Sequence, residues 1–262
     1  MIYWQAVITM EFLLQILILC ALLFLAGLID GVSGGGGIIS FPAYLLVGLP
    51  LPAAYGCNKL QSCLGTATAL VRYAKSGLVD LKAAIPASVT ALLASHIATR
   101  VLLSMSDGAV KVLVAVCMVF LVVLTVLVGR LKSGSLTKLD TNAKTVTLCL
   151  VVGFVLGLYD GFFGPGGGTV ALMLFTLVFG FDMRVASGNG KVVIVVSNLI
   201  ALVSHISQGN VWWKYAIPAT LANMLGCYIG AVVSVKKGAG VIKKLMVLVV
   251  IVVLIQAIGK FF

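Results

Sequence analysis

The residues best suited to polar chemistry lie in two glycine-rich stretches, each a few positions after an aspartate. Asp30 precedes four consecutive glycines, and Asp160 precedes a Gly-Pro-Gly-Gly-Gly block. Glycine weakens a helix by about 1 kcal/mol relative to alanine and proline interrupts it, so each stretch predicts a break between two helical pieces. The substrate-binding candidates in these stretches are Gly34, Gly35, Gly36, Gly37, Gly164, Pro165, Gly166 and Gly167.

A helix break at membrane depth predicts an anion site. Broken backbone leaves N–H and C=O groups unpaired, and it persists only where protein buries it or where it lines a polar cavity. The helix after each break points free N–H groups and the positive end of its dipole at the gap. Close helix packing through small residues is the alternative interpretation. No Lys-Ser or Lys-Thr follows the glycines, which excludes a nucleotide-phosphate loop.

A second polar cluster occurs once in each half of the chain. It comprises Asn58, Lys59, Gln61, Ser62, Thr66 and Thr68 in the first half, and Asn189, Lys191, Ser197 and Asn198 in the second. Amides and hydroxyls hydrogen-bond an oxyanion without burying a full charge. The further substrate-binding candidates are therefore Asn58, Lys59, Gln61, Asn189, Lys191 and Asn198. Snorkelling to the interface is the alternative for the lysines, and helix capping or interhelical bonding for the asparagines.

Three ionisable residues within apolar segments are candidates for proton coupling: Asp30, Asp160 and His205. Ionisable side chains are rare inside membranes and usually functional. Capping of the broken helices is the alternative for the aspartates, and a structural hydrogen bond is the alternative for the histidine. The chain has two histidines, no CxxC pair, and no HExxH or GxSxG motif. The sequence therefore predicts neither an enzyme nor a metal or other cofactor.

The composition requires lipid as the solvent. Apolar residues make up 61% of the chain and charged residues 10%, and a soluble domain of this size cannot bury so much apolar surface. The net charge of +11 comes from residues scattered among short loops, which does not indicate nucleic-acid binding. No Lys or Arg precedes Lys59, so the first apolar run, Phe12–Ile29, is interpreted as a retained membrane helix and not as a signal peptide.

The elements that carry these residues form two copies of one unit. The aspartate-glycine blocks recur at an offset of 130 residues and the Asn-Lys regions at an offset of 132, which indicates an internal duplication. The predicted apolar segments are 12–30, 37–49, 59–75, 83–104, 109–129, 145–162, 167–180, 191–207, 213–235 and 241–259. We assign residues 1–132 to the first transmembrane repeat and residues 133–262 to the second.

The predicted fold is an all-α integral membrane protein with two inverted-topology repeats of about five segments each. The second segment of each repeat is shorter than the roughly 20 residues of a full crossing, so it is a glycine-broken half-helix or part of a re-entrant hairpin. Either choice leaves each repeat with odd parity, and tandem odd repeats are inverted. With the N-terminus outside, thirteen of the 18 Lys and Arg residues fall at cytoplasmic ends, as the positive-inside rule predicts.

The chain resembles the TauE/SafE sulfite exporter family. The resemblance rests on the blocks at 27–42 and 157–168 and on the Asn-Lys and Gly-Asn-Gly-Lys sequences at 58–59 and 188–191, and it covers nearly the whole chain. It implies secondary transport of sulfite, thiosulfate or organosulfonates across the bacterial inner membrane, with coupling to protons or to the membrane potential. Cys57 and Cys63 flank Asn58, and thiol exchange with a sulfur substrate is a subsidiary hypothesis.

The expected partners are a small anion and the lipid bilayer, and a homodimer is a further expectation. The second repeat has Pro165 where the first has Gly35, and Asn189 is shifted by one position relative to Asn58, so the two half-sites are unequal. The residues alone predict only a small anion, because sulfur comes from the resemblance. An uncoupled anion channel and a permease for non-sulfur carboxylates are the alternatives that remain open.

Overall fold

The computed structural model describes residues 2–130, 132–135, 138–140 and 142–238. The helices within these residues are α1 (Ile2–Ser33), α2 (Gly37–Leu46), α3 (Leu51–Lys75), α4 (Leu81–Ser104), α5 (Asp107–Arg130), α6 (Ala143–Phe162), α7 (Gly167–Phe179), α8 (Met183–Ser207) and α9 (Trp213–Lys237). The all-α prediction is confirmed, and each described helix overlaps one predicted segment. The tenth predicted segment, 241–259, lies outside the described residues.

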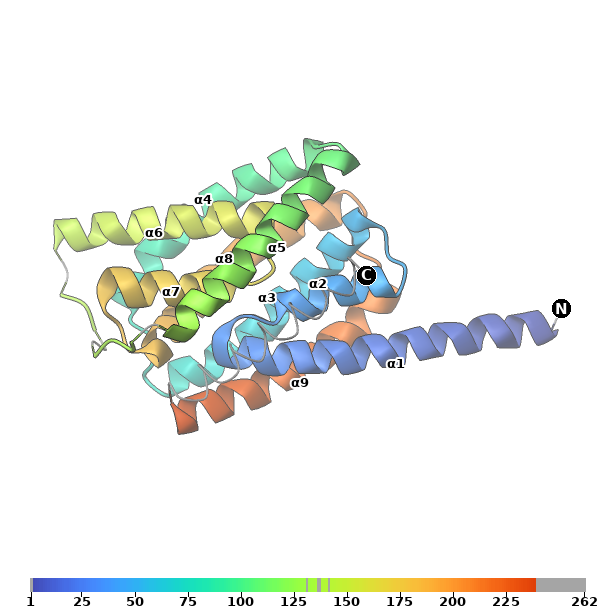
Figure 1. Ribbon diagram of the computed structural model, residues 1–262, viewed down its shortest axis with the longest axis horizontal. Coiled ribbons are helices and arrows are strands. Elements are labelled where there is room, and N and C mark those ends of the chain that lie inside the picture. The colour runs from blue at the N-terminus through green and yellow to red at the C-terminus, as the bar shows by residue number, and fades with distance from the viewer. Residues whose placement is uncertain (1, 131, 136–137, 141, 239–262) are drawn as a thin grey trace.

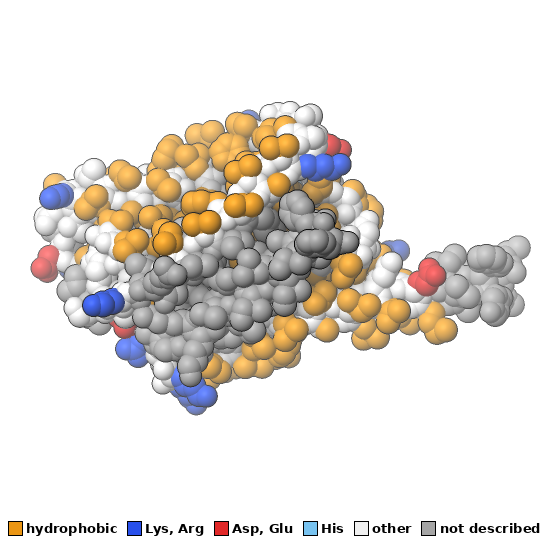
Figure 2. All heavy atoms as spheres, viewed as in Figure 1, with side chains coloured by type: hydrophobic (Ala, Val, Ile, Leu, Met, Phe, Trp, Pro, Cys, Tyr) orange, Lys and Arg blue, Asp and Glu red, His pale blue; other side chains and the backbone are white. Residues whose placement is uncertain are grey.

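The surface of the molecule suits a hydrocarbon solvent. Residues Met10–Ser33 of α1, together with α4, α6, α8 and α9, are long and apolar enough to cross a membrane. Large apolar side chains stand exposed along these helices, including Leu17, Ile97 and Leu221. Figure 2 shows hydrophobic side chains over much of the coloured part of the visible face. So large an apolar surface is not tolerated in water. The chain is therefore a multi-pass membrane protein.

Two helices are too short to cross. α2 has 10 residues and α7 has 13, which correspond to about 15 and 20 Å against a hydrocarbon core of about 30 Å. Each follows a glycine-rich break after a longer helix, α1 or α6 respectively. α2 and α7 are therefore half-helices, as predicted for the second segment of each repeat.

The third helix of each repeat begins earlier than predicted. α3 starts at Leu51 and α8 at Met183, eight residues before the predicted starts. Pro50 immediately precedes α3, and the Asp182 carboxylate accepts the Arg184 N–H at 3.0 Å to cap α8. Lys59 and Lys191 therefore lie about 12 Å inside their helices. Their assignment to segment ends was wrong, because a polar helical turn was interpreted as a loop.

The two repeats interleave. α1 packs along α9, and α4 packs along α6 (Figure 1), so the first helix of each repeat lies against the fourth helix of the other. Small residues make these contacts close: a Cβ added at Gly153 or Gly157 of α6 would collide with the backbone of Ala87 or Ala91 of α4. Such glycine contacts are a usual means of helix association in lipid. Close packing is therefore the role of these glycines.

The glycine breaks of the two repeats touch each other. A Cβ added at Gly34 would collide with the backbone of Gly168, and one added at Gly37 would collide with that of Pro165. Gly34 also has a φ of +79°, a left-handed conformation that glycine adopts without penalty. Residues of α3 and α8 lie beside the point where the two breaks meet, so the breaks lie in the interior of the helix bundle.

Basic side chains gather at one end of the molecule. Figure 2 shows most visible Lys and Arg residues at the left, where the linker between α5 and α6 also lies in Figure 1. This is the end predicted to be cytoplasmic. The orientation of the chain in a membrane, the inversion of the repeats and the boundary at residues 132 and 133 stay predictions.

Replacing Gly34 with alanine is expected to destabilise the protein more than replacing Gly48. Both glycines have positive φ, so both variants carry the left-handed penalty of about 1–2 kcal/mol. A Cβ at Gly48 meets open space, whereas a Cβ at Gly34 meets the backbone of Gly168, which adds an overpacking penalty of about 1–3 kcal/mol. The melting temperatures of the two variants in detergent measure the difference. Equal melting temperatures would show that the breaks do not touch.

Candidate functional site

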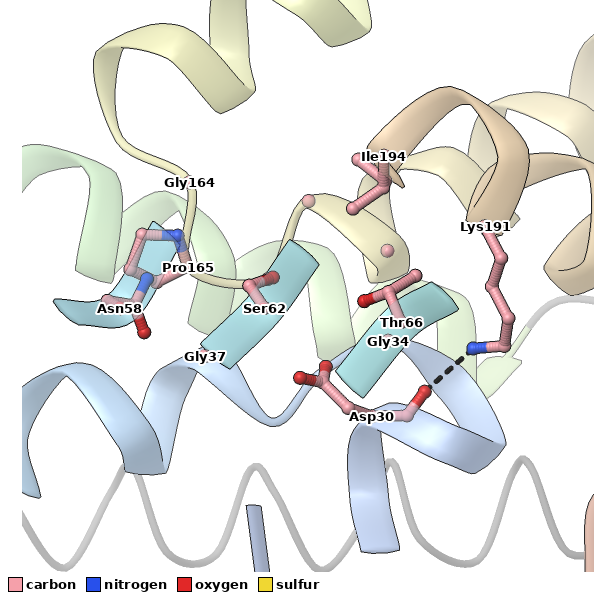
Figure 3. A pocket seen from close by; sticks show the side chains of 13 residues that line it. Asp30, Gly34, Gly37, Asn58, Ser62, Thr66, Gly164, Pro165, Lys191 and Ile194 are labelled. Carbon is pink, nitrogen blue, oxygen red and sulfur yellow. Dashed lines mark hydrogen bonds between the residues drawn. The ribbon is translucent and has the colours of Figure 1, made fainter. Parts of the chain in front are cut away.

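A small cavity lies where the two glycine breaks meet (Figure 3). Its lining comes from both breaks, from α3 and from α8, and consists of Asp30, Gly34, Gly37, Asn58, Ser62, Thr66, Gly164, Pro165, Gly166, Gly167, Gly168, Lys191 and Ile194. The cavity volume is about 20 Å³, which is room for about one water molecule. A polyatomic anion needs more space, so the cavity is too narrow to hold one in this conformation.

Three backbone N–H groups at this cavity have no acceptor among the described residues. They belong to Gly37 at the start of α2 and to Gly166 and Gly168 at the start of α7. Their neighbours are paired: Gly36 donates to the Asp30 carboxylate at 2.8 Å, and Gly167 donates to the Gly164 carbonyl at 3.0 Å. Unpaired N–H groups at two helix N-termini form a site that favours negative charge.

Each broken helix is held at its carbonyl end by a lysine from the other repeat. Lys191 donates to the backbone oxygen of Asp30 at 2.7 Å, and Lys59 donates to the backbone oxygen of Asp160 at 2.5 Å. Both lysines are buried, with exposed fractions of 3% and 1%. Neither snorkels to the interface. A cation at a helix C-terminus is favourable because the carbonyl end of the dipole is negative.

The carboxylates of Asp30 and Asp160 make different contacts. Lys59 also lies 3.2 Å from the Asp160 carboxylate, and Ser197 donates to the same oxygen. Asp160 does not line the cavity. Asp30 lines the cavity and uses one carboxylate oxygen to accept the Gly36 N–H, so it also caps the break. The residues form similar pairs in the two repeats, but only Asp30 faces the cavity.

Asn58 is the predicted amide that reaches the cavity. Its side-chain oxygen accepts from Ser40 at 2.8 Å and from Gln61 at 2.9 Å. Gln61 is buried and does not line the cavity, so it supports Asn58. Because the asparagine oxygen is engaged, its amide NH₂ is the group left to donate toward the cavity.

Comparison with known proteins decides what kind of protein carries this site. The family described as "Sulfite exporter TauE/SafE" matches residues 19–257. The chain belongs to the TauE/SafE family. Members of this family are membrane transporters and not enzymes, which fits a polar cavity enclosed by membrane helices.

Several TauE/SafE relatives cover most of the chain. A "Probable membrane transporter protein ORF9" of Sinorhizobium sp is 32% identical and spans 90% of this chain and 89% of the relative. A "Probable membrane transporter protein" of Haemophilus influenzae is 29% identical over 86% and 87%. The "Probable membrane transporter protein YfcA" of Escherichia coli K12 is 30% identical over 91% and 88%. No solved structure matches. Together these comparisons show a TauE/SafE membrane transporter.

Several predicted site residues lie away from the cavity of this TauE/SafE protein. Gly35, Gly36, Lys59, Asn189 and Asn198 do not line it. The Asn189 oxygen accepts the backbone N–H of Asp80 at 2.8 Å, and Asn198 donates to the Ser62 hydroxyl at 3.2 Å. Asn189 thus links α8 to the N-cap residue of α4, and Asn198 links α8 to α3, in line with the alternative interpretation for them.

His205 is also separate from the cavity. It is 1% exposed and stacks on Tyr55 with ring centroids 6.2 Å apart and planes 5° apart. Neither ring nitrogen has a hydrogen-bond partner among the described residues. The structure therefore places His205 outside the Asp30 site and does not pair it as a structural hydrogen-bonding group.

Four cavity residues were not among the site candidates: Ser62, Thr66, Gly168 and Ile194. Ser62 and Thr66 follow Asn58 at intervals of four, which puts all three on one face of a helix. That spacing was visible in the sequence. Within the described residues, no group of three or more His, Cys, Asp and Glu side chains could hold a metal ion.

Replacing Lys59 with methionine is expected to destabilise the protein by about 3–5 kcal/mol, because it leaves the buried Asp160 carboxylate without its cation. The double variant with Asp160→Asn is expected to recover much of this loss. Lys191→Met is the matched control, since the structure pairs Lys191 with a backbone oxygen and not with a carboxylate. Unfolding in detergent measures all three variants. Equal losses for the two lysine variants, or no recovery in the double variant, would refute the buried ion pair.

Proposed function

We propose that this TauE/SafE protein is a secondary transporter that exports or otherwise moves small sulfur-containing anions, such as sulfite, thiosulfate or organosulfonates, across the bacterial inner membrane. Its N-terminus is outside in this proposal. The observation that carries it is the set of unpaired N–H groups from both breaks around one cavity. The preference for sulfur rests on the description of the family.

The donors around the cavity suit an oxyanion. Backbone N–H groups of Gly37, Gly166 and Gly168, the amide of Asn58, and the hydroxyls of Ser62 and Thr66 are available there. Such donors replace the hydration of the oxygen atoms of an anion. The lysines offset the negative dipole ends of α1 and α6. The positive dipole ends of α2 and α7 are therefore the main helix-dipole contribution at the cavity.

Asp30 supplies a reason for coupling to protons. Asp30 is the carboxylate that lines the cavity. Lys191 also lines it, but its ammonium group donates to the backbone oxygen of Asp30. A bound anion would therefore face a like charge at short range, and the repulsion is large in a medium of low dielectric. Protonation of Asp30 removes that repulsion. We propose that the anion and a proton occupy the site together, with Asp30 as the proton carrier.

The narrow cavity favours alternating access over an open channel. A channel needs a path wide enough for the anion along its whole length, whereas the described residues leave a volume of only about 20 Å³ at the site. Because the breaks touch at Gly34 and Gly168, we propose that substrate enters when the two breaks separate and that the two sides of the membrane gain access in turn.

Replacing Asn58 with leucine is expected to weaken thiosulfate binding by about 10- to 100-fold, the loss of one hydrogen bond to a charged group. Asn189→Leu is the matched control, because Asn189 is buried at nearly the same place in α8 but does not line the cavity. Ligand-induced shifts of the melting temperature measure both affinities. A monodisperse Asn58→Leu protein with unchanged affinity would remove Asn58 from the site.

In proteoliposomes, the wild-type protein is expected to accumulate labelled thiosulfate against its gradient when the outside is made acidic. An uncoupled channel cannot accumulate its substrate against a gradient. Excess oxalate should not inhibit thiosulfate uptake if the site prefers sulfur oxyanions. Asp30→Asn keeps an acceptor for the Gly36 N–H but carries no proton, so this variant should exchange thiosulfate without responding to pH. Asp160→Asn should remain coupled. Accumulation that never exceeds equilibrium would refute the transporter, and a coupled Asp30→Asn variant would refute the carrier.

A further inference from the structure

A second recess lies far from the glycine breaks along the chain, at the ends of α4 and α8. Its volume is about 370 Å³, much larger than that of the cavity between the breaks. The recess is lined by Arg100, Leu103, Ser104, Ser204, Ser207 and Gln208. None of these residues lines the cavity between the breaks, so the recess requires an explanation of its own.

Arg100 brings an unpaired cation to this recess. No carboxylate of the described residues lies within salt-bridge distance of it, and no described acceptor takes a hydrogen bond from it. A guanidinium has five donors in a planar fork that matches the oxygens of a phosphate. The free donors of Arg100 therefore favour an oxyanion in the recess.

The three serines of the recess act mainly as acceptors. Ser104 donates to the Val101 carbonyl at 2.7 Å, and Ser204 donates to the Ile200 carbonyl at 3.2 Å. Ser207 donates to the Ser204 carbonyl at 2.9 Å. Each hydroxyl hydrogen is thus engaged, while the oxygen lone pairs can accept from a ligand. The recess joins a cationic donor with several acceptors, which suits a phosphate that carries a hydroxyl-bearing substituent.

The surroundings of the recess are those of a membrane interface. Trp212 and Trp213 stand 44% and 48% exposed; they lie at the start of α9, a few residues after the end of α8 where the recess lies. Tryptophan is enriched at the level of the lipid head groups. The recess therefore opens at the depth where phospholipid phosphates are found.

Apolar ridges continue from the recess along the two helices. Leu93 and Ile97 lie seven and three residues before Arg100 on α4, and Leu199 and Val203 lie eight and four residues before Ser207 on α8. Positions three, four, seven and eight apart share a helix face. All four side chains are more than half exposed, and α4 packs against α8. The seam between these helices provides an apolar path for acyl chains.

We propose that the Arg100 recess binds the head group of a phosphatidylglycerol molecule, with its phosphate on the guanidinium, its glycerol hydroxyls on the serines, and its acyl chains along the α4–α8 seam. A soluble oxyanion matches the guanidinium but makes no use of the apolar ridges. This site is independent of the proposed transport function, because it uses different residues and requires no movement of the glycine breaks.

Native mass spectrometry of protein released from nanodiscs of equal phosphatidylglycerol and phosphatidylcholine tests the proposal. The wild-type protein should retain phosphatidylglycerol preferentially, and Arg100→Gln should reduce that preference by about tenfold or more. Lys111→Gln is the control, since Lys111 is another exposed cation near the same end of the molecule. Arg100→Lys keeps the charge without the fork and should be intermediate.

The proposal fails if Arg100→Gln retains phosphatidylglycerol as the wild-type protein does, or if Lys111→Gln loses it equally. It also fails if inorganic phosphate or thiosulfate displaces the lipid at millimolar concentration, which would identify a site for soluble anions. If Arg100→Gln does not fold, the lipid preference of the wild-type protein and of Arg100→Lys still decides the outcome. Thiosulfate transport should be unaffected by Arg100→Lys, which separates this test from that of the transport function.

Discussion

The structure depends on how it satisfies helices that stop inside the bundle. Each break exposes carbonyl oxygens on one side and N–H groups on the other, and lipid can pair with neither. Lys59 and Lys191 cross between the repeats and donate to the carbonyl ends at Asp160 and Asp30. At the N–H ends, Gly36 and Gly167 are paired, whereas the N–H groups of Gly37, Gly166 and Gly168 have no acceptor among the described residues. The lysines therefore pair the carbonyl oxygens of Asp30 and Asp160, while unpaired N–H donors remain at the starts of α2 and α7.

The same crossing contacts explain why the repeats interleave. A lysine on α3 must reach the end of α6, and a lysine on α8 must reach the end of α1. Close helix contacts make this reach possible, because glycines of α6 let α4 approach and glycines of α1 let α9 approach. A similar exchange recurs next to the lysines: Asn189 accepts from Asp80 and Cys57 accepts from Trp212. The site is thus built from both repeats at once.

Much of this arrangement was predictable from the sequence. Hydropathy indicated every described helix, and the repeated aspartate-glycine blocks indicated the breaks, because glycine and proline weaken helices whatever surrounds them. The starts of α3 and α8 were wrong because Asn58, Lys59 and Gln61 are polar side chains that tertiary contacts bury inside a helix. Hydropathy cannot distinguish such a turn from a loop.

The roles of individual polar residues depended on side-chain direction. Asn189 corresponds to Cys57 in the repeat, and Asn58 corresponds to Gly190, a shift of one position. One position turns a helical side chain by about 100°, so Asn58 faces the cavity while Asn189 faces Asp80. The unequal half-sites inferred from this shift are reflected in the single carboxylate, Asp30, that lines the cavity. Which residue each lysine contacts could be learned only from the folded structure.

The claim that an anion binds to the bare amides of both breaks is tested most directly with selenite, a heavier analogue of sulfite. Diffraction at the selenium edge from crystals grown with selenite would locate the anion without reference to transport. The account predicts an anomalous peak within hydrogen-bonding distance of the N–H groups of Gly37, Gly166 and Gly168. Stoichiometric selenite found elsewhere, with the breaks still in contact, would contradict it.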